Sequence, residues 1–515
     1  MADGRRWWIS LAALGVFAAN TWAAPVQVES GALKGATEGA LTLYRGVPFA
    51  AAPIGALRWR PPQPPAHWQG VRPAISFAPA CMQKGVSMPG EAPPTTSEDC
   101  LYLNIWTPAR TAKERLPVMV WIHGGGYTNG SASMPLYWGD RLALRGVVVV
   151  TIAYRLGPLG FLAHPELTAE STNKTSGNYG LLDQIAALEW IQRNIAAFGG
   201  DRRRVTIAGQ SAGAMAVSML MASPRAAGLF HGAIGQSGGL FEPLQLAPRY
   251  LLANAERDGQ EYVRSLRADS IAALRERPAA DLLEGRAREV NHPVIEPYAL
   301  PNAPYDAFSS GAYNKVPILL GFNAEEARAL VDVTAVKAGT YAADIERSFG
   351  KLPPPMLEAY RPTGDAEARQ ARLDFERDLR FGWDMWTWAR LQSGAAYFYY
   401  FMRQPPFPAG SIYHGWGASH FAELWYMSDH LDQEQWAWGP DDRQLADQMA
   451  AYWTNFVKNG DPNGPALPHW PAFGTQGEVL RLDAPVSAGA LPGTDKLRIF
   501  DSVYDALRSK PISPR

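Results

Sequence analysis

Cysteine is scarce in this sequence, because Cys81 and Cys100 are the only two among 515 residues. This count excludes a small disulfide-stapled scaffold, and no His and Cys residues stand at the spacings typical of metal ligands. In a chain that is exported, an even pair predicts one disulfide, which here would close a loop rich in Pro, Gly, Ser and Thr. Such a crosslink typically stabilises by about 3 kcal/mol, since it limits the freedom of the unfolded loop. Two buried thiols are the alternative.

A surplus of one charge and long apolar runs are also missing. The formal net charge is −1, which leaves no electrostatic footprint for nucleic acid or an anionic membrane. The apolar run 7–19 follows Arg5 and Arg6 and is too short to span a bilayer. Small residues after it provide a cleavage site, so residues 1–24 are predicted to be a signal peptide. We expect an exported protein, periplasmic or secreted, with no stable membrane insertion once the signal is removed; an uncleaved N-terminal anchor is the alternative.

No repeat, low-complexity segment or linker divides the remaining chain, so we predict a single domain over residues 25–515. Short apolar runs alternate with helical periodicity, which indicates a large, mostly parallel sheet with helices on both faces. Polar, helical stretches near 243–310 and 330–390 are predicted to be insertions that cover the sheet and its site, and 410–429 is predicted to be a loop. Strands are expected at 101–107, 116–122, 147–154, 205–208, 230–235, 316–322, 395–402 and 478–482. Long helices are expected at 179–198, 212–222 and 444–459.

The stretch with the clearest chemical meaning is Gly209-Gln210-Ser211-Ala212-Gly213. A β-rich run precedes this G-x-S-x-G match and a helix-competent run follows it, which is the context that an exposed nucleophile needs. The glycines leave room for a sharp turn, and the helix N-terminus directs positive charge at the serine hydroxyl. We predict that Ser211 is a nucleophile; a chance Gly/Ser turn is the alternative.

A run of glycines follows another predicted strand, at His123-Gly124-Gly125-Gly126. Attack on a carbonyl group builds negative charge on its oxygen, and preorganised backbone N–H donors stabilise that charge by roughly 3–4 kcal/mol each. Glycine lets the backbone approach the substrate closely, and the N–H of Ala212 supplies a further donor directly after the nucleophile. The run is therefore predicted to form an oxyanion hole; a plain loop is the alternative.

A serine nucleophile needs a base, and the base needs an orienting acid. Glu325 and Glu326 follow the predicted strand 316–322 and are the candidates for the acid, although a solvated pair of loop carboxylates is the more general meaning of such a pattern. The chain order Ser, acid, His leaves only the histidines beyond this point as the base. These are His414, His420, His430 and His469.

Two long motifs resemble the type B carboxylesterase family, which includes bacterial para-nitrobenzyl esterases and the cholinesterases. One is FGGDRRRVTIAGQSAG at 198–213, and the other is EDCLYLNIWTP at 98–108. Shorter matches are RGVPFA, HGGGYTNGS and GNYGLLDQ. The resemblance covers essentially the whole mature chain and is thin at 243–310 and 330–390. It implies an α/β-hydrolase fold and hydrolysis of carboxylic esters through an acyl-enzyme.

The resemblance also implies roles for residues that match the family by position. It implies three catalytic residues, three oxyanion donors, a disulfide and two structural ion pairs. These are Ser211, Glu326 and His420; Gly125, Gly126 and Ala212; Cys81 with Cys100; and Arg58 with Glu98 and Arg155 with Asp183. His414, which is followed by glycine, is a local look-alike of the base. The implied chemistry needs no metal and no other cofactor.

Two departures from the family pattern affect these expectations. The residue before the nucleophile is usually Glu in the family and is Gln210 here. A neutral amide removes a charge that would favour protonated histidine, so we expect a lower histidine pKa than in relatives and a Gln210→Glu variant whose acidic pH limb is shifted. The loop between Cys81 and Cys100 holds no tryptophan, whereas cholinesterases carry an aromatic platform for a quaternary ammonium there. Choline esters are therefore disfavoured substrates.

The sequence thus predicts a serine hydrolase of a small-molecule ester with no nucleic-acid partner, and it does not predict an oligomeric state. The many aromatic residues favour an ester with an aromatic or bulky part. Hydrolysis of an amide, carbamate or lactone by the same residues is one alternative. A non-catalytic binding protein on the same fold is another, although such proteins usually lose a catalytic residue. Several aromatic residues are candidates to line the pocket, although each alone is better explained as core. They are Phe241, Trp383, Trp386, Trp416, Phe421, Trp425 and Tyr426.

Overall fold

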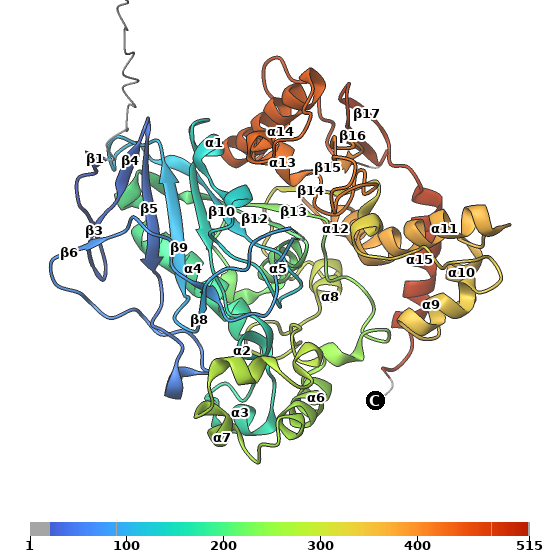
Figure 1. Ribbon diagram of the computed structural model, residues 1–515, viewed down its shortest axis with the longest axis horizontal. Coiled ribbons are helices and arrows are strands. Elements are labelled where there is room, and N and C mark those ends of the chain that lie inside the picture. Colours follow the sequence, from blue (N-terminus) through green and yellow to red (C-terminus); the bar gives the residue numbers. More distant parts are fainter. Residues whose placement is uncertain (1–20, 89, 475, 513–515) are drawn as a thin grey trace, which may run out of the picture.

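The computed structural model describes residues 21–512 apart from 89 and 475, so most of the predicted signal peptide lies outside the described residues. A twelve-stranded mixed sheet forms its centre (Figure 1). In spatial order the strands are β1 (Thr21–Trp22), β4 (Ala36–Glu38), β5 (Leu41–Pro48), β9 (Tyr102–Thr107), β11 (Val148–Ile152), β10 (Leu116–Ile122), β12 (Gly200–Gln210), β13 (Gly232–Gln236), β14 (Ile318–Asn323), β15 (Ala396–Phe401), β16 (Glu478–Leu482) and β17 (Ser487–Ala490). Two small sheets lie beside this sheet. One contains β2 (Val26–Val28), β3 (Gly31–Lys34) and β6 (Val71–Pro73), and the other contains β7 (Ala80–Cys81) and β8 (Thr96–Ser97).

The centre of the large sheet is parallel, as predicted. Every neighbouring pair from β11 through β10 and β12 to β16 runs parallel. The flanking pairs β4–β5, β5–β9, β9–β11 and β16–β17 run antiparallel. The carboxyl ends of β10, β12 and β14 therefore meet at one edge, which is where parallel sheets bind ligands.

Helices cover both faces of the sheet. They are α1 (Asp140–Ala143), α2 (Gly157–Phe161), α3 (Pro165–Glu170), α4 (Tyr179–Asn194), α5 (Ala212–Ala222), α6 (Leu252–Ser265), α7 (Ile271–Arg275), α8 (Pro304–Ser309), α9 (Tyr341–Phe349), α10 (Pro354–Glu358), α11 (Asp365–Arg377), α12 (Trp383–Leu391), α13 (Leu424–Met427), α14 (Pro440–Asn459) and α15 (Thr494–Arg508). Side chains alternate between the faces of a strand. On β10, Val118, Val120 and Ile122 belong to the core beneath α4 and α5, whereas Met119 and Trp121 belong to the core beneath α14.

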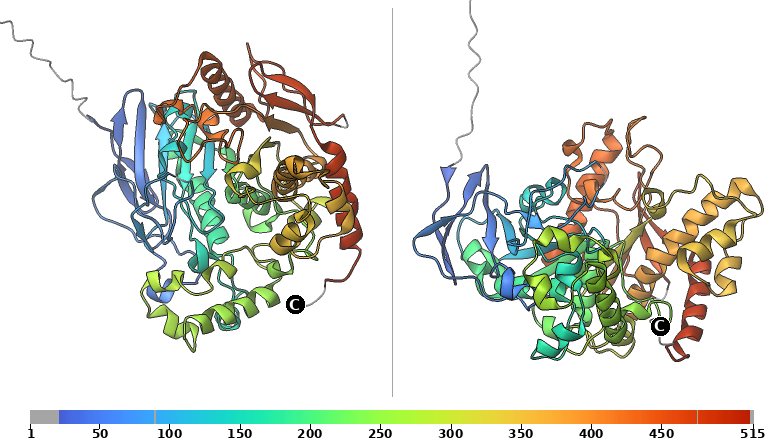
Figure 2. Two further views of the ribbon diagram at one scale, coloured as in Figure 1. Left: turned by 45° about the vertical axis from the view of Figure 1, so that its right-hand side comes forward. Right: turned by 60° about the horizontal axis from the view of Figure 1, so that its bottom comes forward.

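The two predicted insertions form separate helical layers. Helices α6 and α7 pack with α2 and α3 around a small core that includes Tyr262 and Leu274. Helices α9, α10 and α11 lie beside the C-terminal helix α15 (Figure 2). The rings of Tyr360, Phe375 and Phe500 meet between these helices at centroid distances of 5.4 to 6.0 Å. The first insertion therefore buries a small apolar core of its own, whereas the aromatic residues of the second extend the main core of the protein.

The structure differs from the sequence expectations mainly near the C-terminus. The predicted loop 410–429 contains the short helix α13, and the strand β17 and the helix α15 were not predicted. Helix α14 begins at Pro440, four residues before the predicted start, because Asp442 accepts a hydrogen bond from the N–H of Gly439 (2.8 Å) and caps the helix. Along the part of the chain that the structure describes, no helix is long and apolar enough to cross a membrane.

Candidate active site

Ser211 lies in the one-residue turn between β12 and α5. Its backbone has φ 58° and ψ −127°, a combination that non-glycine residues rarely adopt. The N–H of Ser211 donates to the carbonyl of Gln236 (2.8 Å), and the Ser211 carbonyl accepts from the N–H of Met215 (3.0 Å). These bonds, one to the next strand and one into the helix, hold the strained turn and leave the hydroxyl at its tip.

The glycines of the motif are required by space. A Cβ on Gly209 would lie 2.5 Å from the carbonyl of Gly213, and a Cβ on Gly213 would lie 2.1 Å from the carbonyl oxygen of Ile122. A Cβ on Gly238, after β13, would lie 2.3 Å from the carbonyl oxygen of Ser211. Real Cβ atoms do not approach so closely, so the predicted reason for glycine at these turns is confirmed.

Three segments that are distant in the sequence bring Ser211, His420 and Glu326 together. The Nε2 atom of His420 lies 2.8 Å from Oγ of Ser211, and its Nδ1 lies 2.6 Å from Oε2 of Glu326. The other Glu326 oxygen accepts a hydrogen bond from the N–H of Asn323 (2.7 Å). His420 and Glu326 are buried, whereas Ser211 is partly exposed. The arrangement can pass a proton from the serine hydroxyl to an imidazole whose orientation is fixed by a carboxylate.

Phe381 packs on the imidazole of His420. It belongs to a π-helical turn, Asp378–Gly382, in the second insertion, and its ring stacks on the histidine ring at a centroid distance of 4.4 Å and an angle of 24°. Phe421 contacts the same imidazole from its edge at 4.9 Å. The two rings restrict the imidazole to one plane and shield its hydrogen bonds from water.

The structure decides between the adjacent carboxylates Glu325 and Glu326. Glu325 points away from the histidine: its Oε2 accepts from the N–H of Ala418 (2.8 Å), and its Oε1 pairs with Arg328 (2.8 Å). A Cβ on Gly417 would lie only 1.9 Å from Oε2 of Glu325. Glu325 therefore fastens the loop before His420, while Glu326 reaches the imidazole.

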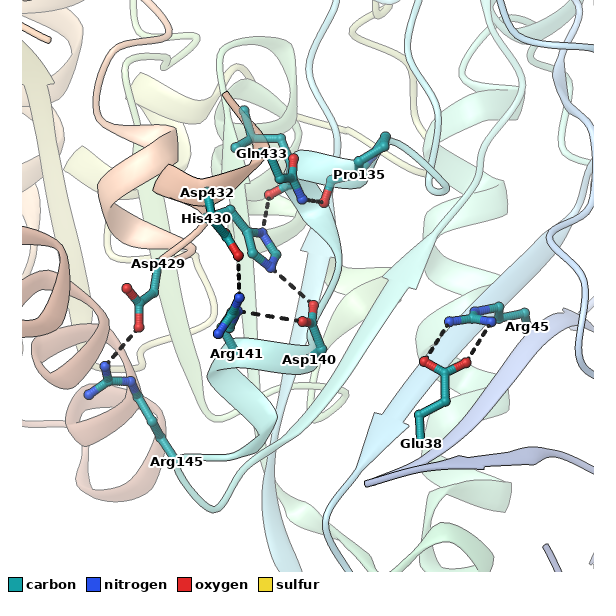
Figure 3. Close-up of polar contacts among 11 residues, drawn as sticks. Glu38, Arg45, Pro135, Asp140, Arg141, Arg145, Asp429, His430, Asp432 and Gln433 are labelled. Carbon is teal, nitrogen blue, oxygen red and sulfur yellow. Dashed lines mark hydrogen bonds and ion pairs between the residues drawn. The ribbon is translucent and has the colours of Figure 1, made fainter. Parts of the chain in front are cut away.

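The other histidine candidates lie away from Ser211. His414 and His469 are exposed on loops. His430 points at α1, where its Nε2 lies 3.0 Å from Oδ1 of Asp140, as Figure 3 shows. The pairs Arg141–Asp432 and Arg145–Asp429 fasten the same segment to α1 and the residues after it. His430, which is itself buried, thus belongs to a polar cluster that joins two distant parts of the chain.

The glycine run after β10 forms a sharp loop beside the nucleophile. Gly125 and Gly126 have φ values of 100° and 62°. The carbonyl of Gly125 accepts from the N–H groups of Thr128 (3.1 Å) and Asn129 (3.0 Å), and a Cβ on Gly125 would lie 2.2 Å from the Asn129 carbonyl oxygen. Ala212 is the first residue of α5, so its N–H has no partner within the helix. Amide donors are thus available on both sides of Ser211.

His123 lies directly before this loop. Burial lowers the pKa of His123 to about 4, so its ring is neutral at pH 7. The ring stacks on Tyr154 at 4.4 Å, and the Tyr154 hydroxyl donates to the His123 carbonyl (2.8 Å). His123 is therefore a structural residue, as its place before the nucleophile in the chain order predicts.

A buried polar network that was not predicted from the sequence lies close to the His420 turn. Asn323 Nδ2 and Gln236 Nε2 donate to the two oxygens of Glu423, at 2.5 and 3.1 Å, and Trp453 donates to Gln236 Oε1 (2.9 Å). Burial, and then the negative charge of Glu326, raise the pKa of Glu423 to about 8. The only sequence signal for this network is the position of Glu423 three residues after His420.

The candidate pocket aromatics lie in different surroundings. Phe421 contacts His420, while Trp416 packs on Tyr413. Trp425 and Tyr413 line a cavity of about 350 Å³ together with Glu91 and Glu434. The remaining four candidates, Phe241, Trp383, Trp386 and Tyr426, are buried core residues.

The expected crosslink and ion pairs are present. Cys81 and Cys100 form a disulfide. Arg58 forms a bidentate pair with Glu98 at 2.6 and 2.7 Å. Arg155 and Asp183 form a fully buried bidentate pair at 2.7 and 2.8 Å.

Comparison with known proteins agrees with this geometry. The chain is a carboxylic-ester hydrolase with the α/β-hydrolase fold. It belongs to the carboxylesterase family, whose model matches residues 23–499.

Three curated relatives illustrate the range of that family. Fumonisin B1 esterase of Sphingopyxis macrogoltabida is 39% identical over 90% of this chain and 86% of its own length. Human cocaine esterase is 35% identical over 91% and 88%, and the Bacillus subtilis para-nitrobenzyl esterase is 34% identical over 92% and 97%. Among solved structures, a thermophilic para-nitrobenzyl esterase superposes with a TM-score of 0.80 at 31% identity, and a Geobacillus stearothermophilus carboxylesterase with 0.79 at 33%. Each covers 92% of this chain and 99% of the solved one.

Proposed function

We propose that this protein hydrolyses esters through a covalent acyl-enzyme, with Ser211 as nucleophile, His420 as base and Glu326 as the orienting acid. The observation that carries the proposal is the unbroken contact from Ser211 Oγ to His420 Nε2 (2.8 Å) and from His420 Nδ1 to Glu326 (2.6 Å). Ser211 and Glu326 follow the ends of different strands of the sheet, and His420 lies on a loop. The alignment of the three side chains therefore depends on the whole fold.

In the first half-reaction, His420 removes the proton of Ser211 as Oγ attacks the ester carbonyl. The N–H groups of Gly125, Gly126 and Ala212 stabilise the negative oxygen of the tetrahedral intermediate. His420 then donates the proton to the leaving alcohol, and the acyl group remains on Ser211. In the second half, His420 activates a water molecule that releases the acid and restores the enzyme.

The identity of the ester is a separate question, since relatives are named for substrates as different as fumonisin B1, cocaine and para-nitrobenzyl esters. The aromatic rings of Phe381 and Phe421 around His420 favour an ester with an aromatic or bulky part. The same residues could cleave an amide, carbamate or lactone, so these bonds belong in the substrate panel.

A panel of p-nitrophenyl esters of increasing acyl length, with aromatic, carbamate, lactone and choline esters, tests this proposal. Ser211→Ala should abolish turnover of every substrate while the circular dichroism spectrum stays unchanged. His420→Ala should lower kcat by several orders of magnitude, whereas His414→Ala, which changes an exposed histidine, should leave it within twofold. Wild-type turnover by Ser211→Ala would refute the mechanism. Absence of turnover by the wild-type protein on every substrate of the panel would instead favour the binding-protein alternative.

We further propose that the protein is exported and that residues 1–24 are removed. N-terminal sequencing of the protein recovered from periplasm or medium should begin at residue 25. A chain that keeps residue 1 and remains with the cytoplasmic fraction would contradict export.

A further inference from the structure

The backbone of the histidine-bearing turn is held by two side-chain amides. Asn323 Nδ2 donates to the carbonyl of Ser419 at 2.7 Å, and Gln210 Nε2 donates to the carbonyl of His420 itself at 2.6 Å. Both amides are fully buried. These are consecutive carbonyls, so the peptide on each side of the His420 N–H and Cα is fixed by a donor from a different part of the sheet.

Each amide comes from the turn that presents another member of the candidate triad. Gln210 is the last residue of β12, directly before Ser211, and Asn323 is the last residue of β14, three residues before Glu326. The N–H of Asn323 also donates to Glu326 (2.7 Å). A shift of the histidine turn relative to the nucleophile would therefore stretch one amide contact, and a shift relative to the acid would stretch the other.

We propose that Gln210 and Asn323 form an amide clamp that sets the position of the catalytic base. They are positioning residues that act through His420, and this inference depends on the function proposed for Ser211, His420 and Glu326. A carbonyl oxygen only accepts hydrogen bonds, so the residue facing it at 2.6 Å must be a donor. Gln at position 210 meets this requirement, whereas the Glu usual in the family does so only when it is protonated.

The buried polar network close to the His420 turn fixes one half of the clamp. Glu423 accepts from the same Asn323 amide that reaches Ser419, and Gln236 holds the other oxygen of Glu423. Gln236 in turn accepts the N–H of Ser211 on its backbone carbonyl (2.8 Å). The nucleophile turn, the acid turn and the base turn are thus connected through buried hydrogen bonds besides those of the triad.

A different role for Gln210, as a neutral residue that only tunes the pKa of His420, makes a distinct prediction. Charge alone would move the acidic limb of the pH–rate profile and leave kcat unchanged on the alkaline plateau, where the imidazole is already neutral. Loss of the clamp would lower the plateau, because the base would be misplaced in every protonation state. A displacement of about 1 Å can cost on the order of 100-fold in rate.

The test compares Gln210→Met, which has similar length and no donor, with Gln210→Glu, which has a donor only when protonated. For Gln210→Met we expect a plateau kcat roughly 10- to 100-fold below wild type with KM within about threefold. For Gln210→Glu we expect a similar plateau loss and a ratio to wild type that rises towards one as pH falls. The matched control is Gln192→Glu, since Gln192 Nε2 donates to the carbonyls of Arg202 (2.8 Å) and Leu229 (2.9 Å) outside the candidate site. This control should keep the wild-type kcat.

The result has two clear forms. Plateau losses in both variants of Gln210, with an unchanged Gln192→Glu, support the clamp. A plateau kcat within twofold of wild type in both variants overturns it, as does a loss confined to KM. If Gln210→Met does not fold, the pH-dependent ratio within Gln210→Glu decides alone. Ser211→Ala separates failure of the triad from failure of the clamp. Turnover at the wild-type rate in Ser211→Ala refutes the triad, whereas a Ser211→Ala variant that loses turnover, together with unaffected Gln210 variants, refutes only the clamp.

Discussion

Replacing Glu423 with glutamine should change how the stability of the protein depends on pH. Burial and the nearby negative charge of Glu326 raise the pKa of Glu423 from 4.5 to about 8. Between these values the folded state binds a proton that the unfolded state releases, so the free energy of unfolding falls as pH rises. From pH 5.5 to 8.5 this one group should cost the wild type roughly 3 kcal/mol, at about 1.4 kcal/mol for each pH unit over most of that window.

Glu423→Gln removes this titration. Its absolute stability carries a pH-independent loss of about 1–3 kcal/mol. Asn323 and Gln236 each donate to one carboxyl oxygen of Glu423, and the glutamine amide places an N–H group against one of these two donors. The decisive measurement is therefore the slope: urea unfolding, followed by tryptophan fluorescence, at several pH values between 5.5 and 8.5. The stability of wild type relative to the variant should decline across this range. Glu478→Gln, at an exposed carboxylate, should keep the wild-type slope. If the free energy of unfolding depended on pH in the same way for wild type and Glu423→Gln, Glu423 would not titrate in this range and the prediction would be wrong.

Three further results are expected. Glu326→Gln should lower kcat by about 100- to 10,000-fold because the imidazole loses its orienting charge, whereas Glu325→Gln should lower it less than tenfold. Both are measured with a p-nitrophenyl ester, and a larger loss in Glu325→Gln would contradict the assignment of Glu326 as the acid. Gly125→Ala should reduce kcat at least 100-fold, since the new Cβ would lie 2.2 Å from the Asn129 carbonyl oxygen and displace the proposed oxyanion donor. A variant that loses thermal stability and keeps its kcat would contradict the role of Gly125 in the oxyanion hole. Joint replacement of Cys81 and Cys100 by alanine should lower the free energy of unfolding by about 3 kcal/mol, and equal urea midpoints for both proteins would count against it.

Most of the sheet could be predicted because buried parallel strands announce themselves as short, continuous apolar runs. The strand β10 was predicted with its observed bounds for this reason, and α5 was predicted because a helix must follow the nucleophile turn. Helix α15 was missed although Leu497, Phe500 and Tyr504 recur at helical spacing, and its partners on α10 and α12 lie far away in the sequence.

The role of Ser211 as nucleophile was predicted from five consecutive residues, because the features that indicate it are local in the sequence. They are a strand, two glycines without room for a Cβ, and a helix N-terminus. The resemblance to a family then narrowed the acid to Glu326 and the base to His420. The residues alone had left Glu325 and three other histidines open, because neighbouring side chains differ only in the direction in which they point.

That direction is a property of tertiary structure. Glu325 and Glu326 are chemically identical, and the hydrogen bonds from Ala418 and Asn323 separate their roles. The same holds for Gln210, which in the sequence is only a departure from a family pattern. The local sequence by itself predicted a nucleophilic serine at the end of a strand in a parallel sheet. Only the folded chain decided what Gln210 does, because its partner, the carbonyl of His420, lies 210 residues further along and reaches it at 2.6 Å once the ends of β12 and β14 stand near the same loop.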